Sequence, residues 1–183
     1  EEFNLDDGYI VLLQHPNTQH VDRARSEMTI SLEAVKATGL PVFVFWPNAD
    51  IGTEAVAESI RSFRELQNPQ QFYFIKNIPS IEFLRLICNA KCLVGNSSVG
   101  VREATFLGVP VVNVGNRQQG RPKGKNVINV SENFDEILAA LKQQIVRKNY
   151  ESEFLYGSGA AGKIIADLLA EMEIPHLDKR ITY

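Results

Sequence analysis

The stretch Cys92–Glu103 reads Cys-Leu-Val-Gly-Asn-Ser-Ser-Val-Gly-Val-Arg-Glu and indicates the fold of the whole chain. Its apolar beginning, Cys92–Val94, is typical of a short buried strand. A helical segment is expected from about Val99 to Leu107, after the small polar residues. The stretch therefore predicts a strand that leads directly into a helix, which is the building unit of an α/β protein.

The same alternation of apolar runs and helical patterns continues on both sides of this stretch. Further strands are expected at Tyr9–Leu13, Pro41–Trp46, Phe72–Ile75, Pro110–Val114 and Val127–Val130. Further helices are expected at about Asp22–Thr38, Thr53–Leu66, Ser80–Asn89, Phe134–Val146 and Gly162–Glu173. Because the strands are continuous apolar runs, they predict a mostly parallel sheet that is covered on both faces, in a doubly wound, Rossmann-like α/β fold.

Length and composition favour an ordinary globular protein. The chain has 183 residues, 44% of them hydrophobic, so we expect residues 1–183 to form a single domain with a polar tail at 175–183. A net charge of −3 gives no basic field for nucleic acid or an anionic membrane, and no apolar stretch approaches the ~20 residues of a membrane span. The beginning, Glu1–Leu5, has no Met and no basic leader, and we interpret it as a cut inside a longer chain.

The two cysteines, Cys88 and Cys92, both lie in or beside apolar runs. A zinc site needs more ligands, and a disulfide-rich scaffold uses denser cysteine. We therefore expect two buried, reduced thiols of a cytoplasmic protein, and no metal.

Polar residues follow each predicted strand, where open α/β sheets bind their ligands. The most specific loop is the fourth, in which Ser97 and Ser98 precede a helix. Helix N-termini favour phosphate, so this loop predicts a phosphate site. The alternative, a helix cap, explains one serine but not the pair. Glu103 can accept hydrogen bonds from ribose hydroxyls, or form a plain ion pair with Arg102.

Two further features suit an anionic ligand. Arg117 and Arg121 lie among glycines after the fifth strand, where a guanidinium matches phosphate oxygens, although a solvated basic turn is the simpler alternative. His15 comes at the end of the first strand, and a catalytic and a structural role are equally compatible with that place. The chain has no Walker lysine motif and no strict Gly-x-Gly-x-x-Gly pattern, which argues against an ATPase and a simple dinucleotide dehydrogenase.

Taken together, these loops resemble those of the hydrolysing UDP-N-acetylglucosamine 2-epimerases, a family that includes bacterial sialic-acid biosynthesis enzymes and part of an animal bifunctional epimerase/kinase. The resemblance covers nearly the whole chain in order. It is carried by Gln14–Thr18, Trp46–Asp50, Gly95–Glu103, Gly115–Arg121 with Asn126–Ile128, and Tyr156–Gly159.

The resemblance implies the second of two Rossmann-like domains in a GT-B arrangement, with the first domain missing from this chain. Such enzymes convert UDP-N-acetylglucosamine and water to N-acetylmannosamine and UDP, by elimination of UDP and addition of water, with no metal or redox cofactor. They are commonly homo-oligomers. The carboxylates that handle the C2 proton belong to the missing half, so the chain alone is expected to be inactive.

The resemblance also implies roles in catalysis and UDP binding for individual residues. It implies a catalytic acid/base role for His15, with contact to the diphosphate. It implies further UDP contacts from Asn48, Ile78, Ser97, Ser98, Glu103 and Arg117. Two other functions share the predicted fold: the donor-nucleotide domain of a GT-B glycosyltransferase, and a UDP-sugar-binding domain without catalysis.

Overall fold

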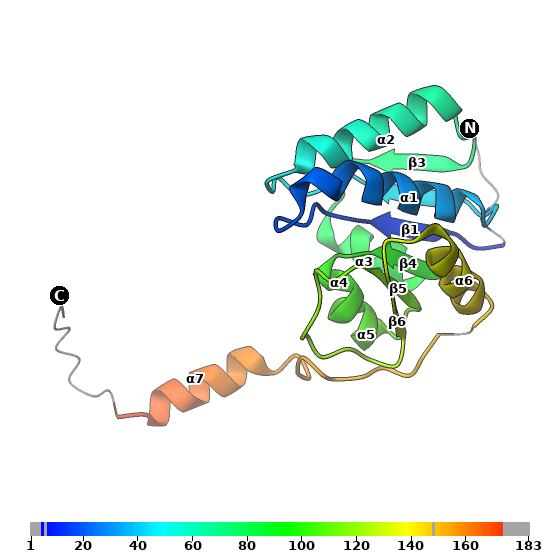
Figure 1. Cartoon of the computed structure of the whole chain (residues 1–183). Coiled ribbons are helices and arrows are strands. Elements are labelled where there is room, and N and C mark those ends of the chain that lie inside the picture. The colour runs from blue at the N-terminus through cyan, green and yellow to red at the C-terminus, as the bar shows by residue number, and fades with distance from the viewer. Residues whose placement is uncertain (1–4, 6, 148, 174–183) are drawn as a thin grey trace, which may run out of the picture.

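The computed structural model describes residues 5, 7–147 and 149–173 of the chain. In this part, six parallel strands form one sheet in the order β3-β2-β1-β4-β5-β6 (Figure 1). They are β1 (Ile10–Leu13), β2 (Val42–Phe45), β3 (Phe72–Ile75), β4 (Cys92–Gly95), β5 (Val111–Val114) and β6 (Val127–Val130). The strand order reverses between β1 and β4, which is the switch point of a doubly wound sheet and confirms the predicted fold class.

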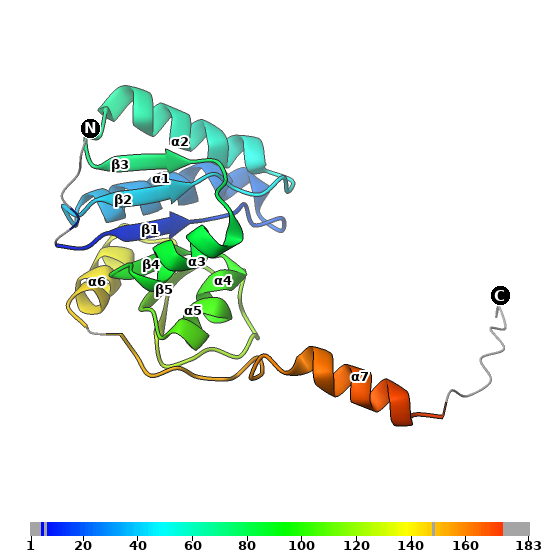
Figure 2. The same cartoon turned by 180° about the vertical axis from the view of Figure 1, so that it is seen from behind.

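Helices cover both faces of the sheet (Figures 1 and 2). One face carries α1 (Ala24–Lys36), which follows the short 3-10 turn η1 (Val21–Arg23), together with α2 (Thr53–Gln67) and α6 (Phe134–Ile145). The other carries α3 (Ser80–Cys88), α4 (Ser98–Val101) and α5 (Glu103–Leu107).

Two apolar cores, one on each face, explain why the strands are continuously apolar. In β1, Ile10 and Leu12 pack with α1, whereas Val11 and Leu13 face the core on the α3 side. All four are at most 7% exposed. Each such side chain contributes about 1.5–3 kcal/mol when it is fully buried, so a polar residue at any of these positions removes a large part of the stability of the sheet.

One predicted helix is wrong. The segment from Val99 to Leu107 forms two short helices, α4 and α5, with a break at Arg102 (φ −103°, ψ −79°). The break allows both Val101 and Ala104 to be fully buried. Gly100 brings α4 close to the sheet, because a Cβ there would lie 3.1 Å from Val111 Cγ1.

Of the two cysteines predicted to be buried, only Cys92 is buried. Cys92 is buried in the sheet, and burial raises the pKa of its thiol. Cys88 is exposed at the end of α3, because that helix buries only Ile87. The predicted polar tail, 175–183, lies outside the described residues. Within those residues, no helix is both long enough and apolar enough to cross a membrane.

The helix α7 (Ala161–Glu171) extends away from the rest of the molecule (Figures 1 and 2). The segment before it is attached to the sheet domain: Tyr150 N–H donates to Gly108 O (2.7 Å), and the Tyr156 hydroxyl donates to Pro122 O (2.8 Å). The helix itself buries no residue. Its large apolar side chains, and one just beyond it, are more than half exposed: Ile164, Ile165, Leu168, Leu169 and Met172.

We predict that Gly95→Ala destabilises the protein much more than Gly120→Ala. Both glycines have a positive φ, which costs an alanine about 1–2 kcal/mol. A Cβ on Gly95 would also lie 2.1 Å from Leu13 O, whereas one on Gly120 would meet nothing within 4 Å. In urea denaturation, we expect Gly95→Ala to lose roughly 4 kcal/mol or more, because β1 and β4 must separate. Equal losses in the two variants would contradict this reason.

Candidate functional site

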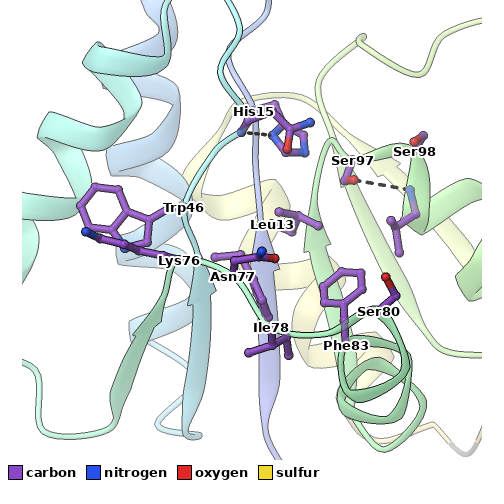
Figure 3. Close-up of a pocket in the computed structure, with 13 residues that line it drawn as sticks. Leu13, His15, Trp46, Lys76, Asn77, Ile78, Ser80, Phe83, Ser97 and Ser98 are labelled. Carbon is purple, nitrogen blue, oxygen red and sulfur yellow. Dashed lines mark hydrogen bonds between the residues drawn. The ribbon is translucent and has the colours of Figure 1, made fainter.

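A cavity of about 320 Å³ opens at the carboxyl edge of the sheet (Figure 3). Its apolar part is formed by Leu13, Phe45 and Phe83, and the two phenylalanine rings meet edge to face at 5.1 Å. The remaining lining comes from the loops after the strands and from the first residues of α3 and α4: His15, Trp46, Asn48, Lys76, Asn77, Ile78, Ser80, Ser97, Ser98 and Val99. The cavity therefore combines an aromatic and aliphatic side with a polar rim, as small-molecule sites usually do.

Five of the seven predicted site residues lie together in this cavity, namely His15, Asn48, Ile78, Ser97 and Ser98. Glu103 and Arg117 do not line it and instead line two other cavities. The three cavities are called the central cavity, the Glu103 cavity and the amide cavity below. The amide cavity is lined by Asn17, Thr18, Gln19, Asn116, Arg117 and Gln119.

Asn96 joins the loops that form the central cavity. Its side-chain Oδ1 accepts from His15 N–H, and its Nδ2 donates to His15 O, both at 2.8 Å. The Asn96 carbonyl accepts from Gln118 Nε2 (2.8 Å) and from Arg117 Nη1 (3.3 Å). Because Asn96 is 4% exposed, these bonds are shielded from water and fix three loops relative to one another.

The ring of His15 is held in one orientation and one tautomer. Its Nδ1 accepts from Asn48 N–H (3.2 Å), so the neutral ring carries its proton on Nε2 (Figure 3). Burial, followed by the Arg117 guanidinium, lowers the pKa of His15 to about 4, although Asp50 acts in the opposite direction. Near neutral pH the ring is therefore an uncharged hydrogen-bond donor.

The two serines have different roles in the structure. Ser97 caps α4, since its Oγ accepts from Val99 N–H at 3.4 Å (Figure 3). Ser98 is the first residue of α4 and is half-buried at the cavity wall. A helix of four residues has a small dipole, so the predicted attraction of phosphate to a helix end is weaker than the sequence indicated. The hydroxyl groups remain suitable donors.

Arg117 lines the amide cavity and is also bonded to Asn96, next to the serines of the central cavity. Its Nη2 is 3.7 Å from Asp50 Oδ2, and its Nη1 reaches Asn96 O. The loop that carries Asp50 is held by Thr53, whose Oγ1 accepts from Asp50 N–H at 2.9 Å. The guanidinium is therefore positioned beside His15 by an acidic partner that sequence reasoning did not assign.

The Glu103 cavity has a volume of about 360 Å³ and is mostly apolar. Leu84, Phe106 and Leu107 form one part, and the chain segment Tyr156–Gly159 forms another. Arg102 lies over the Tyr156 ring, with its guanidinium carbon 5.8 Å from the ring centroid. The Glu103 Oε2 atom is inaccessible to solvent and has no hydrogen-bond partner among the described residues. A buried carboxylate oxygen without a donor is a natural acceptor for a ligand hydroxyl.

Sequence reasoning did not assign several residues of the central cavity. Trp46, Lys76 and Phe83 line it, and no role is predicted from the sequence for any of them. Asn96 enters the prediction only as part of the stretch Gly95–Glu103. The sequence contains a signal for the role of Asn96, namely an amide side chain directly after a buried strand. Such an amide can hydrogen-bond to the backbone at the end of a neighbouring strand.

A doubly wound α/β protein with polar side chains gathered at the switch point of its sheet belongs to the class that binds nucleotides and related ligands there. A family model described as UDP-N-acetylglucosamine 2-epimerase matches residues 1–170. The chain belongs to this family.

Curated relatives include hydrolysing enzymes. The chain is 31% identical over 167 residues to the UDP-N,N'-diacetylbacillosamine 2-epimerase (hydrolyzing) of Legionella pneumophila, covering 91% of this chain and 44% of that protein. It is 29% identical to the UDP-N-acetylglucosamine 2-epimerase of Neisseria meningitidis, covering 84% of this chain and 40% of that protein. The chain thus spans less than half the length of the curated relatives it matches.

Solved structures share the fold. The UDP-GlcNAc 2-epimerase of Neisseria meningitidis bound to UDP-GlcNAc superposes with a TM-score of 0.70 at 18% identity, over 91% of this chain and 46% of that one. The Methanocaldococcus jannaschii enzyme in complex with UDP-GlcNAc and UDP gives 0.67 at 20% identity, over 88% of this chain and 45% of that one. At these identities the similarity establishes the fold.

We predict that His15 makes the protein less stable in weak acid. The unfolded chain binds a proton on His15 near pH 6.5, whereas the folded chain does so only near pH 4. The contribution of His15 is therefore fully present above about pH 6.5 and is lost as the pH falls toward 4. Urea denaturation from pH 7.5 to 4.5 should show a loss in the wild type that exceeds that of His15→Asn by roughly 2 kcal/mol. Parallel curves for the two proteins would contradict the prediction.

Proposed function

We propose that this chain is the UDP-binding, C-terminal part of a hydrolysing 2-epimerase that acts on a UDP-2-acetamido sugar. The observation that supports this most strongly is the meeting of His15, Asn48, Ile78, Ser97 and Ser98 in one cavity of a chain that belongs to the epimerase family. The reaction is UDP-N-acetylglucosamine, or a diacetamido analogue, plus water to UDP and the 2-epimeric free sugar.

In this proposal, the nucleoside lies on the apolar side of the central cavity. The backbone of Ile78 hydrogen-bonds to the uracil, and Glu103, at the beginning of α5, accepts from ribose hydroxyls. The diphosphate lies at the rim, against Ser97 and Ser98, and Arg117 approaches it from the side. The unpartnered Oε2 of Glu103 supports the ribose assignment, because a hydroxyl donor would satisfy it.

The chemistry of this half is the departure of UDP. Elimination breaks the bond between the anomeric carbon and the diphosphate oxygen, and negative charge develops on the leaving group. The Nε2–H of His15, the serine hydroxyls and the Arg117 guanidinium are donors suited to that charge. His15 thus acts as a donor to the leaving group, and its bonded Nδ1 does not serve as a base. No metal or redox cofactor takes part.

The remaining chemistry belongs to the other half of a two-domain, GT-B-type enzyme. In the proposal, that half removes the C2 proton, and its surface covers the exposed apolar side chains of α7. The share of the relatives that this chain spans, 40–44% for the two compared above, leaves room for such a domain. The complete enzyme is cytoplasmic, forms homo-oligomers and serves sialic-acid or related sugar biosynthesis.

Two other functions fit the same fold. A GT-B glycosyltransferase would use the same nucleotide cavity but transfer the sugar to an acceptor. A non-catalytic domain would bind the UDP-sugar and leave it intact. Membership of the epimerase family favours the first proposal over both.

We predict that the chain binds UDP and that Glu103→Gln weakens this binding about tenfold, because an amide replaces a carboxylate acceptor of two ribose hydroxyls. Calorimetric titration measures both affinities. Glu171→Gln, at the exposed end of α7, is the matched control and should bind UDP as the wild type does. An unchanged affinity in Glu103→Gln would remove the ribose assignment. Absence of heat and of chemical-shift changes at millimolar UDP would remove the UDP site altogether.

We predict that a longer form of the protein containing the other half releases UDP and N-acetylmannosamine from UDP-N-acetylglucosamine without any acceptor. The 183-residue chain alone should release neither, because in this proposal the base for the C2 proton belongs to the other half. Product analysis by chromatography separates the three functions. An intact substrate with the longer form would favour the binding domain, and product only in the presence of an acceptor would favour the glycosyltransferase. N-acetylmannosamine formed by the short chain would show that this half suffices.

A further inference from the structure

An acidic side chain lies at the edge that is proposed to bind a diphosphate. Asp50 is in the loop between β2 and α2, and its Oδ2 is 3.7 Å from Nη2 of Arg117. Neither the central cavity nor the amide cavity has a carboxylate among the described residues that line it. Because a carboxylate repels a diphosphate, Asp50 does not serve to attract the ligand.

The loop that carries Asp50 is held in place by its backbone. Asp50 N–H donates to Thr53 Oγ1 at 2.9 Å, and Thr53 N–H donates to Asp50 O at 3.1 Å. Gly52 has a positive φ of 92°, and a Cβ there would lie 3.0 Å from Pro16 Cβ, in the loop after β1. The carboxylate is therefore presented to Arg117 from a fixed loop.

The pair of Asp50 and Arg117 has little to do with the stability of the fold. The N-cap of α2 is Gly52, so the Asp50 side chain does not occupy the capping position. Within the described part of the chain, Arg117 is the one ionic partner of Asp50. The two side chains are 38% and 29% exposed, and pairs screened by water in this way contribute little to stability. A role in ligand binding accounts for the pair better than a role in folding.

Arg117 is held loosely by its two partners. Its Nη1 is 3.3 Å from Asn96 O, and the same carbonyl accepts a shorter bond from Gln118 Nε2 at 2.8 Å. Both Arg117 contacts are longer than the ~2.7–2.9 Å of a strong charge-assisted hydrogen bond. The guanidinium therefore keeps donors for an approaching anion, and such an anion would share it with Asp50.

The charges of Asp50 and Arg117 are both felt at the ring of His15. Arg117 lowers the pKa of His15, and Asp50 raises it. Both groups therefore lie near the ring that, in the proposed function, donates to the departing diphosphate. The negative charge of Asp50 thus acts at the place where the leaving group gathers its own.

We propose that Asp50 holds Arg117 at the edge of the sheet in the free enzyme and competes with the diphosphate for its guanidinium, which speeds the release of UDP. This inference rests on the proposed function and adds a positioning residue to it. When UDP is bound, Arg117 lies between two anions, and their mutual repulsion weakens the complex. When UDP leaves, Asp50 remains as a partner, so the cation is not left unpaired.

The test compares the 183-residue chain with its Asp50→Asn variant. Asparagine keeps the shape and an acceptor oxygen but removes the charge, so we expect the Kd of UDP to fall roughly fivefold in calorimetry. The dissociation of UDP should slow by a similar factor. Stopped-flow fluorescence of Trp46, the single tryptophan of the chain, measures it in the central cavity.

The control is Glu58→Gln, which removes the same charge from the surface pair of Glu58 with Arg25 and should change neither quantity. A damaged loop would weaken UDP binding, whereas relief of the competition strengthens it. Unchanged or weaker binding by Asp50→Asn would therefore overturn the inference.

A second background tests whether Asp50 acts through Arg117. In Arg117→Gln, the further change Asp50→Asn should alter the Kd of UDP by less than about twofold, because no cation remains to be shared. An undiminished gain in that background would show that Asp50 repels UDP directly and would overturn the competition. If the wild type binds no UDP at millimolar concentration, the proposed function fails first. Binding by the wild type without a gain in Asp50→Asn removes this inference alone.

Discussion

The two hydrogen bonds between the Asn96 side chain and the backbone of His15 are the constraint on which the whole binding edge depends. They join the two chain segments beyond the point where the backbone ladder of β1 and β4 ends at Leu13 and Gly95. The two strands approach closely enough for these bonds because residue 95 is a glycine. A side chain there would collide with Leu13 O. The His15 ring in turn accepts from Asn48 N–H, and the carbonyl of the same Asn96 accepts from Arg117.

The electrostatics of the edge are local. The chain is acidic overall, α4 is too short for a strong dipole, and the Arg117 cation already faces Asp50. An anionic ligand therefore gains mostly from close, oriented donors and little from a long-range field. Because His15 is neutral near pH 7, it offers an anionic ligand a hydrogen bond and no positive charge. The release of an anionic product therefore breaks no ion pair with His15.

Local sequence patterns predicted the strands well, because buried parallel strands are continuous apolar runs. They also predicted that His15, Asn48 and the serines lie at one edge of the sheet, where the structure brings them into one cavity, because residues after parallel strands share that edge. They failed where the outcome depends on contacts distant in sequence. The break at Arg102 follows from packing against the sheet, and the role of Asn96 depends on a residue 81 positions away. Likewise, nothing local separates Glu103 and Arg117 into cavities other than that of His15.

The way α7 is attached has a mechanical consequence. Up to Tyr156 the connecting segment is hydrogen-bonded to the sheet domain, and after it come Gly157 and Gly159, both with positive φ (105° and 85°). These two glycines connect the hydrogen-bonded segment to the helix, and they also belong to the wall of the Glu103 cavity. A partner that displaced α7 would therefore pull on that wall before it reached any of the loops that Asn96 holds together.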